Sequence, residues 1–181
     1  IDTTVHRDAV REAMSGFRPA DYLSAYPFYT VNDRRFRFVR DRVLGASAYE
    51  DILDAMMAAR KTSRETLAEG LWMNAEQLRD LHADGHVIGL HSHTHPTTLA
   101  ALPAKDQAQE YRENHRILSG LLGSEPDTMS HPCNSYSDGT LDLLRKLGIR
   151  LGFRSNSCPG PLSPLEHPRE DHANVVKRLG L

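Results

Sequence analysis

Apolar residues recur at helical spacing through the first seventy positions of the chain. The pattern predicts helices over residues 5–14, 36–44 and 49–60. In the last of these, Ile52, Leu53, Met56 and Met57 fall on one side of a helix and form a single apolar stripe. We therefore expect residues 1–70 to form a helical segment.

From Trp72 onward the pattern changes to short apolar strands that alternate with helices. Asn74 with Gln77 three residues later is typical of a helix start, and Ser137 is a second N-terminal cap. The pattern predicts another helix over 104–122, and strands over 87–90, 127–132 and 149–153. Such alternation is typical of an α/β fold with parallel strands, whose functional groups follow the carboxyl ends of the strands.

Composition and charge narrow the possible functions. The 181 residues suffice for one domain, and 25% charged with 39% hydrophobic residues is ordinary for a globular protein. The longest apolar run, residues 55–59, is too short to span a membrane. The 22 basic and 24 acidic side chains give a net charge of -2, which disfavours nucleic acid as a partner. Residues 33–42 hold five arginines, but the helical spacing of Phe36 and Val39 indicates a solvated basic helix face.

Histidines gather directly after the predicted strand 87–90. Residues 85–96 read GHVIGLHSHTHP and contain His91, His93 and His95. Imidazole is the commonest protein ligand for zinc and similar metals, and alternating histidines at a strand end can direct two rings toward one point. We predict that His91 and His95 bind a metal and that His93 points away or supports them. His115 lies on the apolar face of the long helix and is interpreted as a core residue.

These residues resemble two motifs of a known family. The segment DGHVIGLHSHTHP at 84–96 is similar to the second motif of polysaccharide deacetylases with a NodB-homology domain (carbohydrate esterase family 4), and SHPCNSYSD at 130–138 resembles their third motif. The resemblance covers roughly residues 72–175. It implies an incomplete NodB-type distorted (β/α) barrel in residues 71–181, with residues 1–70 as a helical insertion, one domain overall.

The resemblance also implies a reaction and its residues. It implies hydrolysis of N-acetyl groups on a sugar or glycan, with Zn²⁺ or another divalent metal held by His91 and His95. An oxyanion would be stabilised at Pro132, Cys133 and Asn134 through a main-chain N–H. An aspartate would act as the base and a histidine as the acid.

The chain departs from the family pattern in three places. The acidic first motif, which supplies the aspartate base and a third ligand, is absent: the acid pairs Glu50–Asp51 and Glu170–Asp171 do not follow a predicted strand. Because the chain begins at Ile1, we expect the early strands to be missing at the N-terminus and this chain alone to be inactive. Cys133 and Asn134 replace an aromatic residue and a glycine, and His167 and His172 are only candidates for the acid.

Two alternatives stay open. The same metal site could serve an amidase that acts on a non-sugar C–N bond, because a fold does not determine its substrate. The chain could also be a non-catalytic member of the fold that binds glycans or acts as a scaffold. Since Trp72 is the sole tryptophan and is expected to pack in the core, no aromatic glycan-binding surface is predicted. We therefore favour a small or lipid-linked sugar and a cytoplasmic location.

Overall fold

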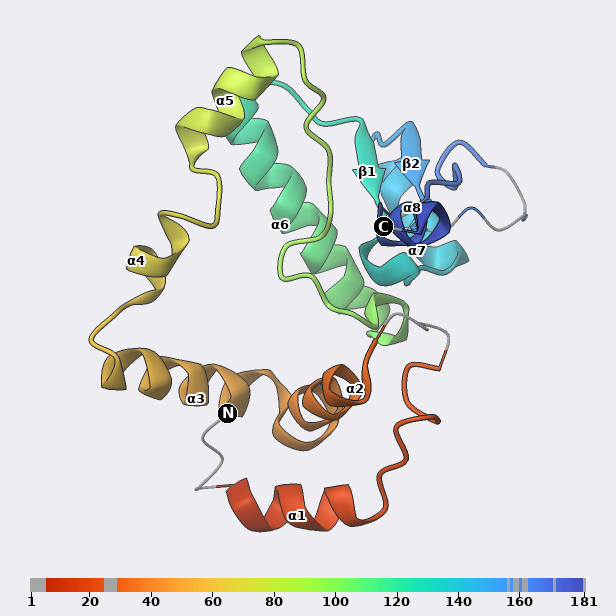
Figure 1. The fold of residues 1–181 in the computed structure, drawn as a ribbon. Helices are drawn as coiled ribbons and strands as arrows, with labels where there is room; N and C mark the ends of the chain where they lie inside the picture. Colours follow the sequence, from red (N-terminus) through yellow and green to blue (C-terminus); the bar gives the residue numbers. More distant parts are fainter. Residues whose placement is uncertain are drawn as a thin grey trace. The chain divides into compact units, whose positions relative to one another are not determined.

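The computed structural model describes residues 6–24, 29–155, 157, 160, 163–170 and 172–180 (Figure 1). The chain divides into two compact units, Ile1–Trp72 and Met73–Leu181. That residues 1–70 are an insertion into the second unit's domain stays a prediction.

The first unit is helical, as its sequence pattern predicts. Its elements are α1 (Arg7–Ser15), α2 (Val31–Phe38), the π-helical segment η2 (Val39–Leu44), α3 (Gly45–Ala59) and α4 (Arg64–Ala68). Thr30 caps α2 through a reciprocal capping box with Asp33, and the helix begins at Val31, five residues before the predicted start. The rings of Phe17 and Phe38 pack with centroids 4.6 Å apart and help hold α1 against the following helices.

The second unit alternates helices with short strands. Its elements are α5 (Ala75–Ala83), η3 (Leu99–Ala101), α6 (Ala104–Leu122), β1 (Thr128–Ser130), η4 (Pro132–Asn134), α7 (Asp138–Lys146), β2 (Leu151–Phe153) and α8 (His172–Leu179). The predicted caps Asn74 and Ser137 both make capping boxes, and α6 has the predicted bounds. Gly123 ends α6 in the left-handed conformation (φ 69°). The sequence pattern did not predict α8.

The strands run parallel and adjoin in a short sheet. β1 pairs with β2 in the register Met129 to Gly152, and isolated bridges add Leu90 beside Met129 and His167 beside Phe153. The α/β class is therefore confirmed. The part of the chain that the structure describes shows a two-stranded sheet with these bridges and no closed barrel. A sheet with so few strands cannot close into a barrel, because a barrel of this kind needs about eight strands.

The predicted strand over 87–90 pairs only at Leu90. Leu90 donates its N–H to the Thr128 carbonyl and accepts from the Ser130 N–H, both at 2.9 Å. Val87 is 75% exposed, so the start of this segment lies away from the sheet's hydrophobic face.

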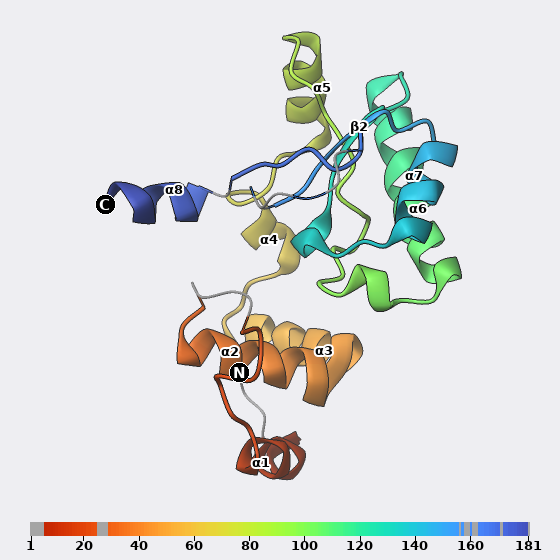
Figure 2. The same cartoon turned by 90° about the vertical axis from the view of Figure 1, so that its right-hand side faces the viewer.

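One face of the sheet carries the core. Leu90 and Met129 are almost fully buried and cluster with Tyr111 of α6 and Leu144 of α7. Figure 2 shows α6 and α7 side by side, and they are in contact. The apolar face expected for α6 includes Tyr111 and Leu118, both of which are buried. Residues of the opposite face of the sheet line the candidate site.

The expectation that Trp72 packs in the core is wrong. Trp72 is 74% exposed, and its neighbours Leu71 and Met73 are 72% and 59% exposed. These residues lie between α4 and α5, where no amphipathic element directs a side chain inward. Among the described residues, no helix has the length and apolar character needed to cross a membrane.

Gly152 is predicted to contribute to stability because the absence of a side chain lets the backbone at Leu165 lie against β2. A Cβ at this position would lie 2.5 Å from the carbonyl oxygen and 2.8 Å from the Cα of Leu165. We expect Gly152→Ala to lower the free energy of unfolding by about 1–3 kcal/mol, the usual range for overpacking. Urea denaturation followed by circular dichroism would measure it.

The matched control is Gly120→Ala. Gly120 lies inside α6 with open space around its Cα, so alanine there should stabilise the protein by about 0.5–1 kcal/mol through helix propensity. Similar shifts of the same sign in both variants would contradict the steric argument.

Candidate functional site

The open face of the sheet forms a hollow of about 500 Å³. Its lining includes Gly89 and His91 from the segment before β1, Thr128 and Ser130 from β1, and Phe153 from β2. Since the paired positions of parallel strands place side chains on the same face, His91, Ser130 and Phe153 form one row at the strands' carboxyl ends. This is where α/β proteins bind ligands, as the sequence pattern predicts.

His91 and His95 lie together beside this hollow. Their ring centroids are 4.9 Å apart and the rings are tilted by 50°. The Nδ1 atom of His91 is 2.8 Å from the carbonyl oxygen of Ser130. Because a carbonyl can only accept, Nδ1 carries the proton in this contact, which leaves the lone pair of Nε2 available to a ligand.

The surroundings favour the neutral form of the His91 ring. Partial burial lowers the pKa of His91, an effect that the Ser130 carbonyl opposes and that the charges of His95 and Arg169 reinforce. Neutral imidazole is the form that can bind a metal, so the direction of this shift is compatible with the metal site predicted from the sequence.

A strained turn brings the two histidines together. Ser92 and His95 have φ angles of 64° and 57°, a conformation that non-glycine residues adopt at a cost of about 1 kcal/mol or more each. The buried Ser92 hydroxyl accepts the His95 N–H at 3.2 Å and closes the turn. His93, between them, is exposed.

These donors fit a divalent metal as an incomplete ligand set. Two imidazoles, one with its second nitrogen held by a carbonyl, are a usual part of a zinc site. Catalytic zinc sites use three protein ligands, however, and within the described ranges no group of three or more His, Cys, Asp or Glu residues could hold a metal ion.

The loop predicted to stabilise an oxyanion follows β1 directly. Pro132 is buried, and Cys133 and Asn134 have φ angles of 48° and 57°. The Asn134 side chain accepts the Ser155 N–H at 3.2 Å and so ties the loop to the end of β2. Cys133 is half-buried, and Cys158 lies outside the described residues.

Backbone strain gathers in these two loops. Of the six described non-glycine residues with positive φ, four belong to them: Ser92, His95, Cys133 and Asn134. Strained backbone of this kind is concentrated at functional sites, where the surrounding structure enforces it. The structure thus brings both resemblance motifs to one end of the sheet, joined by the His91–Ser130 contact.

The two histidines proposed as acids are placed differently. His167 pairs with β2 at Phe153, three strand positions from His91, or roughly 14 Å at ordinary strand spacing. His172 is the first residue of α8 and is exposed. Neither belongs to the described lining of the hollow, and the acid assignment stays a prediction. Of the acid pair Glu170–Asp171, Asp171 lies outside the described residues.

His131 belongs to the segment that resembles the third motif, but the sequence analysis gave it no role, and the structure places it in the core next to the site. It is 1% exposed, its Nε2 lies 2.8 Å from the Leu165 carbonyl, and its ring stacks on Tyr136 at 4.0 Å. Burial lowers the pKa of His131. The Tyr136 hydroxyl donates to buried Glu166 at 3.0 Å. These contacts fasten the tail to the loop after β1.

Three further polar residues reach the site without a sequence signal. Arg169 lines the hollow, with its guanidinium 3.4 Å from the Ser130 hydroxyl. Glu110 and Asn114 of α6 hydrogen-bond the histidine loop. Glu110 and Asn114 are four residues apart, which predicts only that they share one face of a helix. The sequence does not show that this face contacts the histidine loop.

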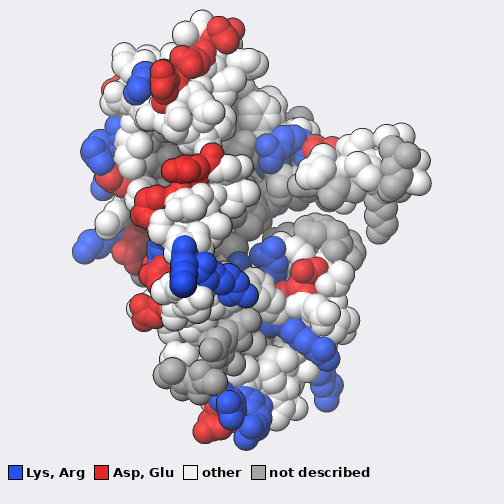
Figure 3. All heavy atoms as spheres, turned by 60° about the vertical axis from the view of Figure 1, so that its left-hand side comes forward, with Lys and Arg blue, Asp and Glu red and all other residues white. Residues whose placement is uncertain are grey.

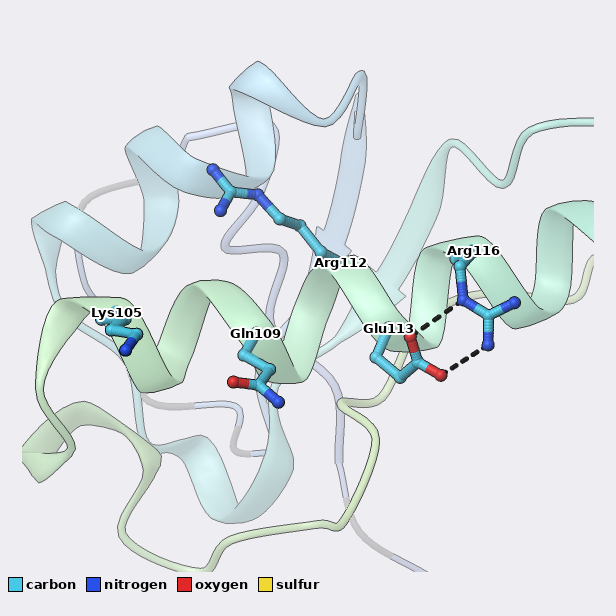
Figure 4. Close-up of a pocket in the computed structure, with 5 residues that line it drawn as sticks. All are labelled: Lys105, Gln109, Arg112, Glu113 and Arg116. Carbon is cyan, nitrogen blue, oxygen red and sulfur yellow. Dashed lines mark hydrogen bonds and ion pairs between the residues drawn. The ribbon is translucent and has the colours of Figure 1, made fainter.

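A second hollow, of about 320 Å³, lies along α6 (Figure 4). It is lined by Lys105, Gln109, Arg112, Glu113 and Arg116. Glu113 and Arg116 pair with each other through two hydrogen bonds of 2.6 and 2.9 Å, which neutralises part of the basic charge. This hollow has no strained loop and no histidine in its lining.

Comparisons with known proteins agree with the motifs. The model of a protein family described as polysaccharide deacetylase matches residues 47–152, a range that begins within α3. No curated protein matches the chain. Among solved structures, the Streptococcus pyogenes deacetylase PplD in complex with acetate is similar in fold, with a TM-score of 0.50 and 21% identity. The similarity covers 54% of this chain and 44% of that one, so the chain spans less than half of its length.

Proposed function

The chain belongs to the polysaccharide deacetylase family, and on this basis we propose that its protein is a metal-dependent hydrolase that removes N-acetyl groups from a carbohydrate. The observation that carries the proposal is the His91–His95 pair at the carboxyl ends of the strands, with Nδ1 of His91 held by Ser130. A bound divalent metal would polarise the acetamide carbonyl and lower the pKa of a bound water.

The residues of this chain would orient the reactants. His91 and His95 would hold the metal on the open face of the sheet, and the hollow beside them would receive the sugar. The main-chain N–H of Cys133 would lie near the developing oxyanion, where a fixed donor lowers the barrier, whereas the N–H of Asn134 already donates to the His131 carbonyl at 3.3 Å. Arg169, at the rim of the hollow, could bind a polar group of the sugar.

The similar solved structure supports this assignment in one respect. PplD is a deacetylase in complex with acetate, and acetate is the product expected when an N-acetyl group is hydrolysed. We expect the strands at Leu90, β1 and β2, with the bridge at His167, to form part of a barrel of the NodB type. The base and the third ligand are expected from a segment outside the described residues.

The substrate is proposed only by class. A small sugar was favoured because Trp72 was expected to be buried and so not to stack on a long glycan. Because Trp72 is exposed, this reason no longer holds, and polymeric and small N-acetylated sugars are both to be tested. The net charge of -2 is the basis for the expectation that nucleic acid is not a partner, and the face drawn in Figure 3 carries both acidic and basic side chains. A cytoplasmic location stays a prediction.

A non-catalytic, glycan-binding role is the second candidate, favoured by the incomplete ligand set of the described residues. Acetate release decides between the two. The full-length protein, loaded with Zn²⁺ or Co²⁺, is incubated with N-acetylated polymeric, lipid-linked and nucleotide-linked sugars, and acetate is measured with and without a chelator. Chelator-sensitive release supports the deacetylase. Binding of sugars without release supports the second candidate, and release that resists a chelator contradicts the metal dependence.

A further inference from the structure

We propose that Glu110 and Asn114 of α6 are positioning residues that hold the His91–His95 turn in its metal-binding shape. The inference rests on the proposed function, because the turn matters for catalysis only if the histidines bind a metal. Neither residue lies in the motifs that connect the chain to its family.

Glu110 binds the middle of the turn through both carboxylate oxygens. Oε2 accepts the main-chain N–H groups of His93 at 2.9 Å and Thr94 at 2.7 Å. Oε1 accepts the Thr94 hydroxyl at 2.7 Å. Consecutive N–H groups that converge in this way form a small anion-binding concavity, and here a carboxylate of the protein fills it.

Asn114 fixes the start of the turn. Its Oδ1 accepts the main-chain N–H of His91 at 2.9 Å, while the ring of the same His91 contacts the Ser130 carbonyl at 2.8 Å. His91 is therefore held at its backbone by α6 and at its ring by β1. With the Ser92 bond to His95, these contacts occupy the N–H groups of His91, His93, Thr94 and His95.

The helix that provides these contacts is itself rigidly placed. Glu110 and Asn114 lie one turn apart on α6, and Tyr111 between them is completely buried in the core. The turn needs such external support because Ser92 and His95 both have positive φ, which short loops keep only when their surroundings enforce it. Without Glu110, the turn is free to relax and the two rings to separate.

The variants separate positioning from simple loss of charge. Glu110→Ala removes all three hydrogen bonds, whereas Glu110→Gln removes the charge but keeps an oxygen for the two N–H groups and an amide for the Thr94 hydroxyl. Glu113→Ala is the matched control: it removes a glutamate from the same helix, one that pairs with Arg116 (Figure 4). Asn114→Ala tests the second contact.

The first measurement is Co²⁺ affinity of the full-length protein, followed by the visible absorption of the bound ion. Partners that orient metal ligands typically contribute 10–100-fold in affinity. We expect Glu110→Ala and Asn114→Ala to weaken binding by about that factor and to alter the absorption spectrum, Glu110→Gln to recover most of the loss, and Glu113→Ala to bind as the unaltered protein does. Equal affinity and spectra in all variants would overturn the inference, as would an equal loss in Glu113→Ala.

A second measurement works on the metal-free protein and so separates this inference from the proposed function. Amide hydrogen exchange at His93 and Thr94 should be slow in the unaltered protein, at least tenfold faster in Glu110→Ala, and unchanged in Glu113→Ala. If the unaltered protein binds no Co²⁺ but shows this exchange pattern, the proposed metal site fails while the positioning of the turn stands. Fast exchange in the unaltered protein would overturn the positioning itself.

Discussion

Replacing His91 and His95 together with alanine is expected to weaken Zn²⁺ binding by more than about a hundredfold, because even the outer partners of a metal site commonly contribute 10–100-fold. The ring centroids of His91 and His95 are 4.9 Å apart. Nδ1 of His91 contacts the Ser130 carbonyl, so its Nε2 is available to a metal. Either single variant leaves one imidazole and should retain weak binding. In the full-length protein, the double variant should release no acetate.

Equilibrium dialysis with metal analysis measures the affinity, and circular dichroism verifies the fold. The matched control is His86→Ala: His86 is an exposed histidine just after α5, outside the strained turn. It should bind Zn²⁺ like the unaltered protein. Undiminished binding in the double variant would remove His91 and His95 from the site, and a loss in the His86 variant as large as in the double variant would show that the effect is nonspecific.

Truncating Leu144 should cause a large loss of stability in the second unit. Leu144 is completely buried where α7 meets the core that also contains Tyr111 and Met129. Leucine-to-alanine changes at such positions typically cost about 2–5 kcal/mol, because apolar contact is lost and a cavity remains. We expect Leu144→Ala to lower the free energy of unfolding by that amount and to reduce the urea midpoint without changing the slope.

Leu71→Ala is the control of identical chemistry. Leu71 is 72% exposed, so its truncation should change the free energy of unfolding by no more than about 0.5 kcal/mol. Comparable losses at both positions would mean that burial does not determine the cost. A shallow unfolding transition in the Leu144 variant would instead show that the core no longer unfolds cooperatively.

Local sequence signals predicted most of the secondary structure. The capping residues Asn74 and Ser137 mark helix starts through bonds to their near neighbours, and both act as predicted. The short strands were harder to delimit: the segment before His91 pairs only at Leu90, because strand length depends on what lies alongside it. Trp72 was misplaced for the same reason, since its burial depends on a distant partner that the pattern cannot reveal.

By itself, the sequence determined the α/β alternation, the family and the pairing of His91 with His95, because spacing along the chain encodes all three. Only the tertiary structure decided how that pair is supported. The Ser130 carbonyl, Glu110 and Asn114 come from 16 to 39 residues away along the chain and meet the turn only after the sheet and α6 have packed. Packing is a property of facing surfaces, so residues with ordinary local patterns become part of a site when a fold places them there.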